Sequence, residues 1–374
     1  MIGLGIESTA HTFSCAIIEK NGKNGKILSD VRKIFRPEAG QGIHPREASR
    51  HHIENSPLVL SECLSEANVS VKDLDIISYA AGPGLGPCLR VGAVVARSLS
   101  SFYKIPIYPV NHAIGHIELG KLLTGANDPL VLLVSGGHTM LLSFLNKQWR
   151  VFGETLDITL GQLLDQFGRS IGFASPCGKN IEELASTSTN YVPLPYSVKG
   201  NDVSFSGLLS ATKPISEKSK VDACYSLQET AFAMISETVE RALSFTSKKE
   251  LMIVGGVAAN KRLSEMLKDV CKRHGAKFFV VPLKYAGDCG SQISPANDRQ
   301  VENQELFFSA ETLMCTRAGE FKRFTREGRC LGEKYVEFGK LIAIPSVKIR
   351  KQMCQLQHKR IIITFSIKHM NRIF

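Results

Sequence analysis

Residues 130–139, LVLLVSGGHT, join an apolar strand to a loop of small and polar residues. A second strand is predicted at 140–145 and a third at 149–152, because a polar turn separates two further apolar runs. Small residues let backbone N–H groups approach an anionic oxygen, and successive amides in a turn form an anion-binding concavity. This stretch therefore predicts a strand–loop–strand–turn–strand unit with a phosphate-binding loop.

The N-terminus repeats this unit. Residues 2–12, IGLGIESTAHT, lead into predicted strands at 13–18 and near 27–35, with a Gly-Lys-Asn-Gly turn between them. Both loops contain the pattern Ser-x-x-His-Thr. A unit that occurs twice in one chain indicates an α/β fold with two related lobes that face each other.

Two more glycine-rich loops are present. Residues 82–90, GPGLGPCLR, enter an apolar helix at 91–99, and residues 254–260, VGGVAAN, follow a strand at 251–254. Asn260 is expected near the N-cap of the next helix, where backbone amides favour anions. Four such loops favour a nucleotide or phosphoester cleft between the lobes over simple tight turns. Further helices are predicted at 44–67, 161–172 and 225–245.

His112 and His116 are the strongest candidates for chemistry. They lie four residues apart in NHAIGHIE, so a helix places both imidazoles on one face, with Cβ atoms about 5–6 Å apart. Two such imidazoles can hold zinc or iron, and Asp288 in a turn-rich run is the best remote third ligand. An isolated pair is more often a core or solvated pair, but the four loops favour the metal. A second metal site is the weaker hypothesis, formed by His44, His51 and His52.

Composition is that of an ordinary globular protein. The chain has 374 residues, of which 43% are hydrophobic and 22% charged, and this length suits two lobes or domains. No apolar run is long enough to predict a membrane span, and the N-terminus lacks the features of a signal peptide. Ten cysteines without Cys-x2-Cys spacing are expected to be reduced thiols in the cytoplasm, which argues against a cysteine-based zinc module.

Nine short motifs follow one another along residues 1 to about 294. They read GIESTAHT at 5–12, GIHPREA at 42–48, GPGLGPCLRVG at 82–92, NHAIGH at 111–116, VSGGHT at 134–139, FGETLDI at 152–158, SFSGL at 204–208, SLQETAF at 226–232 and GGVAAN at 255–260. In these stretches the chain resembles the tRNA threonylcarbamoyladenosine transferase family, the TsaD-like proteins and their relatives in the KEOPS complex.

The resemblance implies the two-lobed actin, sugar-kinase and heat-shock-ATPase superfold, with lobes at 1–120 and 121–294. It implies transfer of a threonylcarbamoyl group from threonylcarbamoyl-AMP to the N6 amine of the adenosine adjacent to the anticodon, in tRNAs that read ANN codons. One divalent metal, iron with zinc as the alternative, is implied at His112, His116 and Asp288. The adenylate is implied to bind at Leu133, Val134, Ser135, Gly136, Gly137, Asp165, Gly178, Glu182 and Asn260.

The implied partners are tRNA and KEOPS-type accessory subunits, including a small kinase-like ATPase, and no membrane. No general base can be assigned, since an amine that attacks an activated acyl group needs little help.

The sequence departs from the family pattern at three places. Pro176-Cys-Gly-Lys179 replaces Pro-Gly-Gly-Pro, so Cys177 adds a side chain where we expect the backbone to need a positive φ. Leu133 stands where archaeal relatives often have Tyr. After Asp288-Cys-Gly-Ser-Gln-Ile293, the family's apolar helix gives way to unrelated sequence, and Pro295 would break a helix there.

We interpret residues 295–374 as a divergent basic tail. Residues 340–374 contain eight Lys or Arg and no Asp or Glu, so the net charge of +11 falls to about +3 for residues 1–339. Overall charge is therefore weak evidence for nucleic-acid binding. The tail is either the product of a shifted reading frame or a lineage-specific extension that contacts tRNA phosphates.

Three other functions compete with the transferase. A non-catalytic scaffold subunit of the same complex would follow if the altered C-terminal region impaired activity. An ATPase or sugar kinase of the same superfold needs carboxylates for magnesium, a task that the histidine pair does not fit. A metallopeptidase of the His-Glu-x-x-His class needs Glu after its first His, where Ala113 stands.

Overall fold

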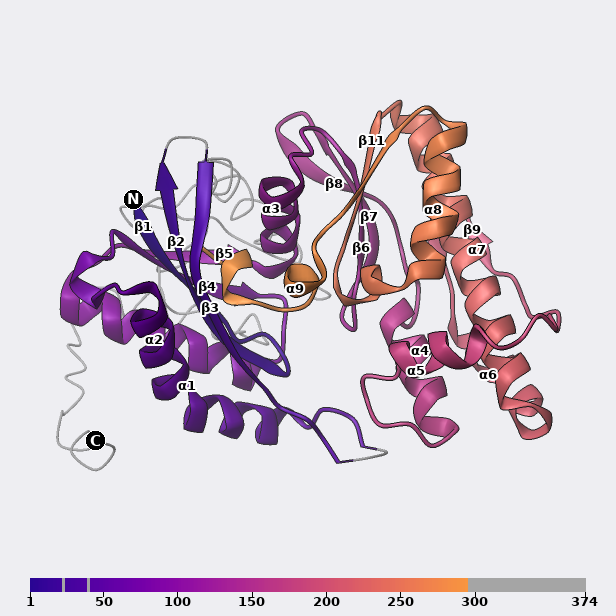
Figure 1. Cartoon of the computed structure of the whole chain (residues 1–374), viewed down its shortest axis with the longest axis horizontal. Coiled ribbons are helices and arrows are strands. Elements are labelled where there is room, and N and C mark those ends of the chain that lie inside the picture. The colour runs from indigo at the N-terminus through magenta and orange to yellow at the C-terminus, as the bar shows by residue number, and fades with distance from the viewer. Residues whose placement is uncertain (22–23, 39–40, 295–374) are drawn as a thin grey trace, which may run out of the picture. The chain divides into compact units, whose positions relative to one another are not determined.

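A computed structural model describes residues 1–21, 24–38 and 41–294 (Figure 1). All of these residues belong to one compact unit of the chain. The predicted tail at 295–374 lies outside the described residues, so neither hypothesis for it is tested. In the described part, no helix is long and apolar enough to cross a membrane.

The first five-stranded sheet is built by the N-terminal third of the chain. Its strands are β1 (Ile2–Glu7), β2 (Thr12–Asn21), β3 (Asn24–Ile34), β4 (Ile76–Gly82) and β5 (Ile107–Asn111), in the order β3-β2-β1-β4-β5. The first three strands pair antiparallel, then β4 pairs in parallel with β1 and β5 pairs in parallel with β4.

The second sheet repeats this topology. Its strands are β6 (Leu130–Val134), β7 (Thr139–Leu145), β8 (Gln148–Glu154), β11 (Glu250–Val254) and β12 (Lys277–Val280), in the order β12-β11-β6-β7-β8. Again three antiparallel strands come first, and two parallel strands add to the free side of the first strand. Both predicted units are therefore confirmed as equivalent sheets. A separate short hairpin joins β9 (Val198–Lys199) to β10 (Asp202–Val203).

The helices connect and cover the two sheets. They are α1 (Pro45–Ala67), α2 (Gly86–Tyr103), α3 (His112–Thr124), α4 (Leu160–Ser170), α5 (Gly178–Ala185), α6 (Ser206–Lys218), α7 (Lys220–Thr246), α8 (Lys261–Arg273) and α9 (Leu283–Ala286), with 3-10 turns η1 (Val71–Asp73), η2 (Gly256–Ala259) and η3 (Gly290–Gln292). The first sheet packs on α1 and α2, and the largest core lies between the second sheet and helices α4 to α8.

Strand β6 shows why its sequence is apolar throughout. Leu130, Leu132 and Val134 point into the core under helices α4 to α8, whereas Val131 and Leu133 pack with α3 on the opposite face. Successive strand residues alternate between faces, so a strand covered on both sides needs a continuous apolar run. Helix α3 contacts strands of both sheets and η3, and Figure 1 shows it between them.

The last described segment returns to the first sheet. A Cβ on Gly5 would lie 2.3 Å from the Gly290 carbonyl oxygen and 2.5 Å from the Ser294 nitrogen, so only glycine fits in β1 at this point. Gly290 N donates to Ser14 Oγ at 2.9 Å, which fixes η3 against β2. The residues before η3, including Asp288, are thereby held near the ends of β1 and α3.

Candidate metal and nucleotide site

Helix α3 positions the histidine pair. The Asn111 side chain accepts hydrogen bonds from the N–H groups of Ala113 and Ile114, which caps the helix and starts it at His112. Gly125 ends the helix in the left-handed conformation, with φ 73°. His112 and His116 therefore lie one turn apart, as predicted, and both are buried.

Asp288 completes a group of three candidate ligands. One ligand atom from each of His112, His116 and Asp288 can be chosen so that all lie within 4.8 Å of one another. Asp288 Oδ1 is 3.5 Å from His112 Nε2 and 3.4 Å from His116 Nε2. Donors on a tetrahedral ion with bonds of about 2.1 Å are separated by about 3.4 Å. The spacing of these donors therefore suits a shared zinc- or iron-sized ion.

The buried ring of His116 also suits this fit. Its Nε2 atom is shielded from solvent and lies 3.4 Å from Asp288 Oδ1, but not in hydrogen-bonding geometry. A buried nitrogen without a well-formed hydrogen bond is costly, and a cation between the two imidazoles and the carboxylate would satisfy it. Two nitrogens and one carboxylate oxygen are also an ordinary donor set for zinc and non-haem iron.

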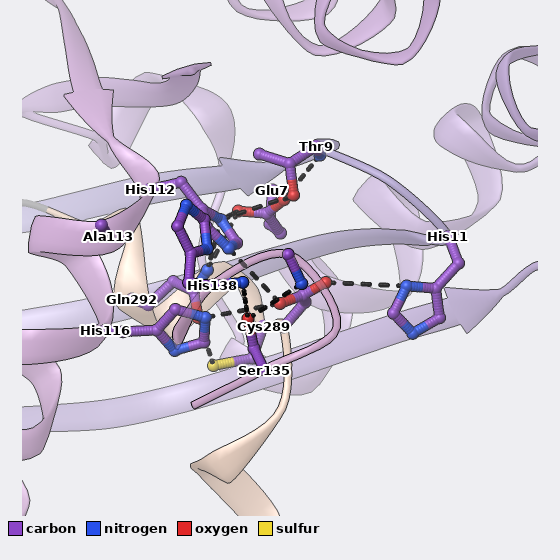
Figure 2. A network of polar contacts seen from close by, with 12 residues as sticks. Glu7, Thr9, His11, His112, Ala113, His116, Ser135, His138, Cys289 and Gln292 are labelled. Atoms are coloured by element: carbon purple, nitrogen blue, oxygen red, sulfur yellow. Dashed lines mark hydrogen bonds and ion pairs between the residues drawn. The ribbon is translucent and has the colours of Figure 1, made fainter. Parts of the chain in front are cut away.

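Glu7 lies behind His112 at the end of β1 and is fully buried. Its Oε1 accepts hydrogen bonds from Thr9 N at 2.6 Å and Thr9 Oγ1 at 2.5 Å. Its Oε2 is 3.0 Å from His112 Nδ1 and 3.1 Å from Gln292 Nε2 (Figure 2). A carboxylate on Nδ1 keeps the proton on that nitrogen, so Nε2 is left to face the other candidate ligands.

The charges of the group reinforce one another. Burial disfavours the charged imidazole of His112, but Glu7 outweighs burial and raises the pKa of His112 to about 9. Burial lowers the pKa of His116 despite the neighbouring carboxylate. Burial also opposes ionisation of Asp288, yet its contacts with His116 and His112 hold the pKa of Asp288 well below its usual range. Without a metal, His112 is therefore protonated near pH 7 between the carboxylates of Glu7 and Asp288, and a bound cation would replace a proton of that imidazole.

The two equivalent loops each bring a histidine to this group. His11 Nδ1 lies 3.7 Å from Asp288 Oδ2, and the His138 ring stacks on His112 with centroids 5.9 Å apart. Burial lowers the pKa of His138 to about 4, so the ring is neutral near pH 7. Neither residue was predicted from the sequence, although the shared Ser-x-x-His-Thr pattern was the available signal.

Ser135 shapes the loop between β6 and β7. Its Oγ accepts hydrogen bonds from Gly137 N at 3.2 Å and His138 N at 3.0 Å. The loop also packs closely on two neighbours, because a Cβ on Gly161 would lie 2.5 Å from Ser135 O, and one on Gly255 would lie 2.2 Å from Val134 O. Three predicted features, this loop, α4 and the 254–260 loop, therefore meet at the end of β6.

Asp165 on α4 fixes the next loop. Its Oδ1 accepts from Cys177 N at 2.7 Å and its Oδ2 from Ser175 Oγ at 3.0 Å. Each oxygen keeps a lone pair for a further donor, so these bonds do not test the predicted contact with a ribose. The expectation of a positive φ at Cys177 was wrong: its φ is −87°, and its buried side chain packs against Gly168.

The remaining predicted binding residues lie on α5 and α8. Gly178 begins α5, and a Cβ there would meet no atom within 4 Å. Glu182 Oε1 accepts a hydrogen bond from Lys261 N at 2.7 Å, at the first residue of α8. Asn260 is the N-cap of α8, as predicted, and its Nδ2 donates to Gln228 Oε1 at 3.1 Å. The predicted adenylate residues therefore form a connected set, but no contact here identifies their ligand.

The second hypothetical metal site gains no support. His51 and His52 are adjacent on α1, with their Nδ1 atoms 3.4 Å apart. His44 precedes the helix and makes no side-chain capping bond. Within the described ranges, the only group of three metal-ligating side chains is the one formed by His112, His116 and Asp288.

Known proteins share both sequence and fold with this chain. A sequence model of the family TsaD, tRNA N6-adenosine threonylcarbamoyltransferase, matches residues 26–294. The tRNA N6-adenosine threonylcarbamoyltransferase of Staphylothermus marinus is 48% identical over 303 residues, which cover 78% of this chain and 89% of that protein.

A probable bifunctional tRNA threonylcarbamoyladenosine biosynthesis protein of Methanothermobacter thermautotrophicus is 47% identical over 296 residues, 79% of this chain and 55% of that protein. The chain thus spans about half the length of this bifunctional relative.

Among solved structures, HypF of T. kodakarensis superposes with a TM-score of 0.57 at 13% identity, over 83% of this chain and 48% of that one. A full-length HypF in its phosphate- and nucleotide-bound form gives 0.55 at 11% identity, over 82% and 55% of the two chains. At these identities the likeness concerns the fold alone, which is the two-lobed α/β superfold of actin, sugar kinases and heat-shock ATPases.

Proposed function

The chain belongs to the tRNA N6-adenosine threonylcarbamoyltransferase family, and we propose that it transfers threonylcarbamoyl from threonylcarbamoyl-AMP to an adenosine in tRNA. As a member it is a transferase that modifies tRNA. The proposed acceptor is the N6 amine of the adenosine adjacent to the anticodon, in tRNAs that read ANN codons.

The observation that carries this proposal is the adjacency of the metal group to the small-residue loop. His138 belongs to the loop after β6 and stacks on His112 of the metal group. An acyl adenylate presents a phosphate and a carbonyl one bond apart. A phosphate-binding loop with a cation site beside it therefore suits both groups of such a ligand.

The proposed reaction needs positioning more than proton chemistry. The N6 amine attacks the carbamoyl carbon, a C–N bond forms, the bond from that carbon to the phosphate oxygen breaks, and AMP leaves with its electron pair. The amine proton passes to solvent or to the leaving phosphate. Holding the two reactants in attack geometry supplies much of the rate enhancement, and no general base is assigned.

Each predicted site residue has a part in this proposal. His112, His116 and Asp288 would hold one divalent ion, iron or zinc, which as a Lewis acid would stabilise charge on the acyl donor. The loop at Leu133–Gly137 would bind the phosphate, which would use Gly136 N–H or share the Gly137 N–H that donates to Ser135 Oγ. Asp165, Gly178, Glu182 and Asn260 would surround the nucleoside, with Asp165 and Glu182 accepting ribose hydroxyls through their remaining lone pairs.

The proposed setting is the cytoplasm, with tRNA as substrate and KEOPS-type accessory subunits as partners. A small kinase-like ATPase is one of these subunits, and a separate enzyme must supply the adenylate. The names of the bifunctional relatives are consistent with a second activity that acts in the same pathway.

The test is nucleoside mass spectrometry on unmodified tRNA. The chain is incubated with accessory subunits and threonylcarbamoyl-AMP, and Asp288→Ala is run in parallel. Threonylcarbamoyladenosine should form with the unaltered chain and fall to background with the variant. A folded, metal-loaded chain that makes no product would support the scaffold alternative instead.

A further inference from the structure

Gln292 is the last residue of η3 and is fully buried beside the metal group. Its Nε2 lies 3.1 Å from Glu7 Oε2 and 3.0 Å from His112 Nδ1. Figure 2 shows its side chain reaching toward His112 and Glu7. From the sequence, Gln292 lies in the run Asp288–Ile293, just before the chain departs from the family pattern, and no role was assigned to it.

His112 Nδ1, Gln292 Nε2 and Glu7 Oε2 form a triangle with nearly equal sides. His112 Nδ1 is 3.0 Å from Glu7 Oε2, which nearly equals both distances made by Gln292 Nε2. A carboxylate oxygen has two lone pairs and can accept two donors at once. This triangle is therefore best explained as two N–H groups that converge on one oxygen, rather than as a hydrogen bond between the nitrogens.

The Glu7 carboxylate is thus held by two donors on each oxygen. Thr9 supplies its backbone N–H and its hydroxyl to Oε1, while His112 and Gln292 serve Oε2. Because Glu7 is fully buried, each lost donor leaves charge unsatisfied. Thr9 follows β1 directly, but Gln292 comes from the far end of the described chain, so it secures the side of Glu7 that faces the metal group.

We propose that Gln292 is a positioning residue of the metal centre. Its amide fixes Glu7 Oε2 where that oxygen accepts the hydrogen bond from His112 Nδ1–H, and the Nε2 lone pair of His112 then faces His116 and Asp288. The inference rests on the metal role proposed for His112. It adds a residue from η3 whose amide contacts Glu7 Oε2 and His112 Nδ1 rather than the candidate ligand atoms His112 Nε2, His116 Nε2 and Asp288 Oδ1.

The test measures metal binding rather than turnover. The full chain is stripped of metal, and Zn²⁺ affinity is determined by competition with a chromophoric chelator, with Co²⁺ absorption as a check on geometry. Gln292→Met keeps the length of the side chain and removes its polar atoms. We expect it to weaken Zn²⁺ binding about tenfold and Glu7→Gln to weaken it by about 10–100-fold, as for other partners of metal ligands.

Two controls separate this inference from the proposed function. Gln148→Met makes the same replacement at the start of β8, and Zn²⁺ affinity should stay at the wild-type value. Asp288→Ala should abolish binding. If the wild-type chain binds no Zn²⁺, or Asp288→Ala binds as well as wild type, the proposed metal centre fails. If those two behave as expected but Gln292→Met binds as tightly as wild type, only the role of Gln292 is overturned.

If Gln292→Met does not fold, the imidazole ¹⁵N chemical shifts of the wild-type protein test the positioning role instead. In the Zn²⁺-loaded wild-type protein, Nδ1 of His112 should carry the proton and Nε2 should not. The opposite tautomer would refute the positioning role of both Glu7 and Gln292.

Discussion

Gly168 on α4 faces Cys177, and this contact can be tested by exchanging the side chains. A Cβ on Gly168 would lie 2.2 Å from Cys177 Cβ and 2.7 Å from Cys177 Sγ, whereas non-bonded carbons normally lie about 3.5–4.0 Å apart. The Cβ of Cys177 is fixed to the backbone, so a rotamer change cannot relieve the contact. We therefore expect Gly168→Ala to be strongly overpacked.

The magnitude follows from two opposing effects. Overpacking of a core costs about 1–3 kcal/mol, and the upper end applies because the closest atom cannot rotate away. Alanine in place of glycine within a helix returns up to about 1 kcal/mol. Gly168→Ala should therefore reduce the free energy of unfolding by about 2 kcal/mol. In Gly168→Ala/Cys177→Gly the contact is absent and the helix gain remains, so the two changes should show a favourable coupling of about 3 kcal/mol.

The assay is urea unfolding followed by the fluorescence of Trp149, the single tryptophan, which is buried in the second sheet. All four proteins of the cycle are compared at one temperature and with matched metal content. Additive effects, within about 0.5 kcal/mol, would refute the proposed contact between the two residues. Such a result would place the Cys177 side chain elsewhere and reopen the conformation of the 175–178 turn.

Three further predictions concern other parts of the same unit. Asp157 accepts hydrogen bonds from Ser204, Phe205 and Ser206; burial opposes its ionisation, but these bonds lower its pKa. Its stabilising effect should be present above pH about 4 and lost as pH falls further, so acid unfolding curves of wild type and Asp157→Asn should converge at low pH. Asn260→Ala removes the cap of α8 and the hydrogen bond to Gln228, so calorimetry should show that the free energy of unfolding falls by about 2 kcal/mol. An unchanged free energy of unfolding would mean that Asn260 does not stabilise the fold. Gly5→Ala would press on the Gly290 and Ser294 backbone, so chelator competition should show weaker Zn²⁺ binding although no ligand has changed, and wild-type affinity would contradict the placement of η3.

Local patterns in the sequence were sufficient to predict the fold. The strand predicted at 130–134 has those bounds in the structure, and the helix predicted at 44–67 runs from Pro45 to Ala67. The helix predicted at 225–245 is longer, because Ser219 caps it and the helix begins at Lys220, five residues earlier than the apolar stripe suggested. Periodicity locates buried segments, but caps and exposed turns set their ends.

The site was predictable only where its residues lie in short motifs. His112 and His116 share a helix face, so their spacing revealed them, and Asp288 was found as an acidic residue in a turn. Glu7 and Gln292 were missed because they meet across nearly the whole described chain. Neither has a neighbour in sequence that reveals the contact, and only the return of η3 to the first sheet brings them together.

That pairing of residue 7 with residue 292 has a consequence for synthesis of the protein. The N-terminal strands and α3 emerge from the ribosome long before Asp288 and Gln292, so a nascent chain holds His112 and His116 without their carboxylate and without the amide behind Glu7. Contacts so distant in sequence form late in folding. At the proposed metal site, high-affinity uptake should therefore begin only after nearly all described residues have been translated, and metal content would report that the chain was completed through η3.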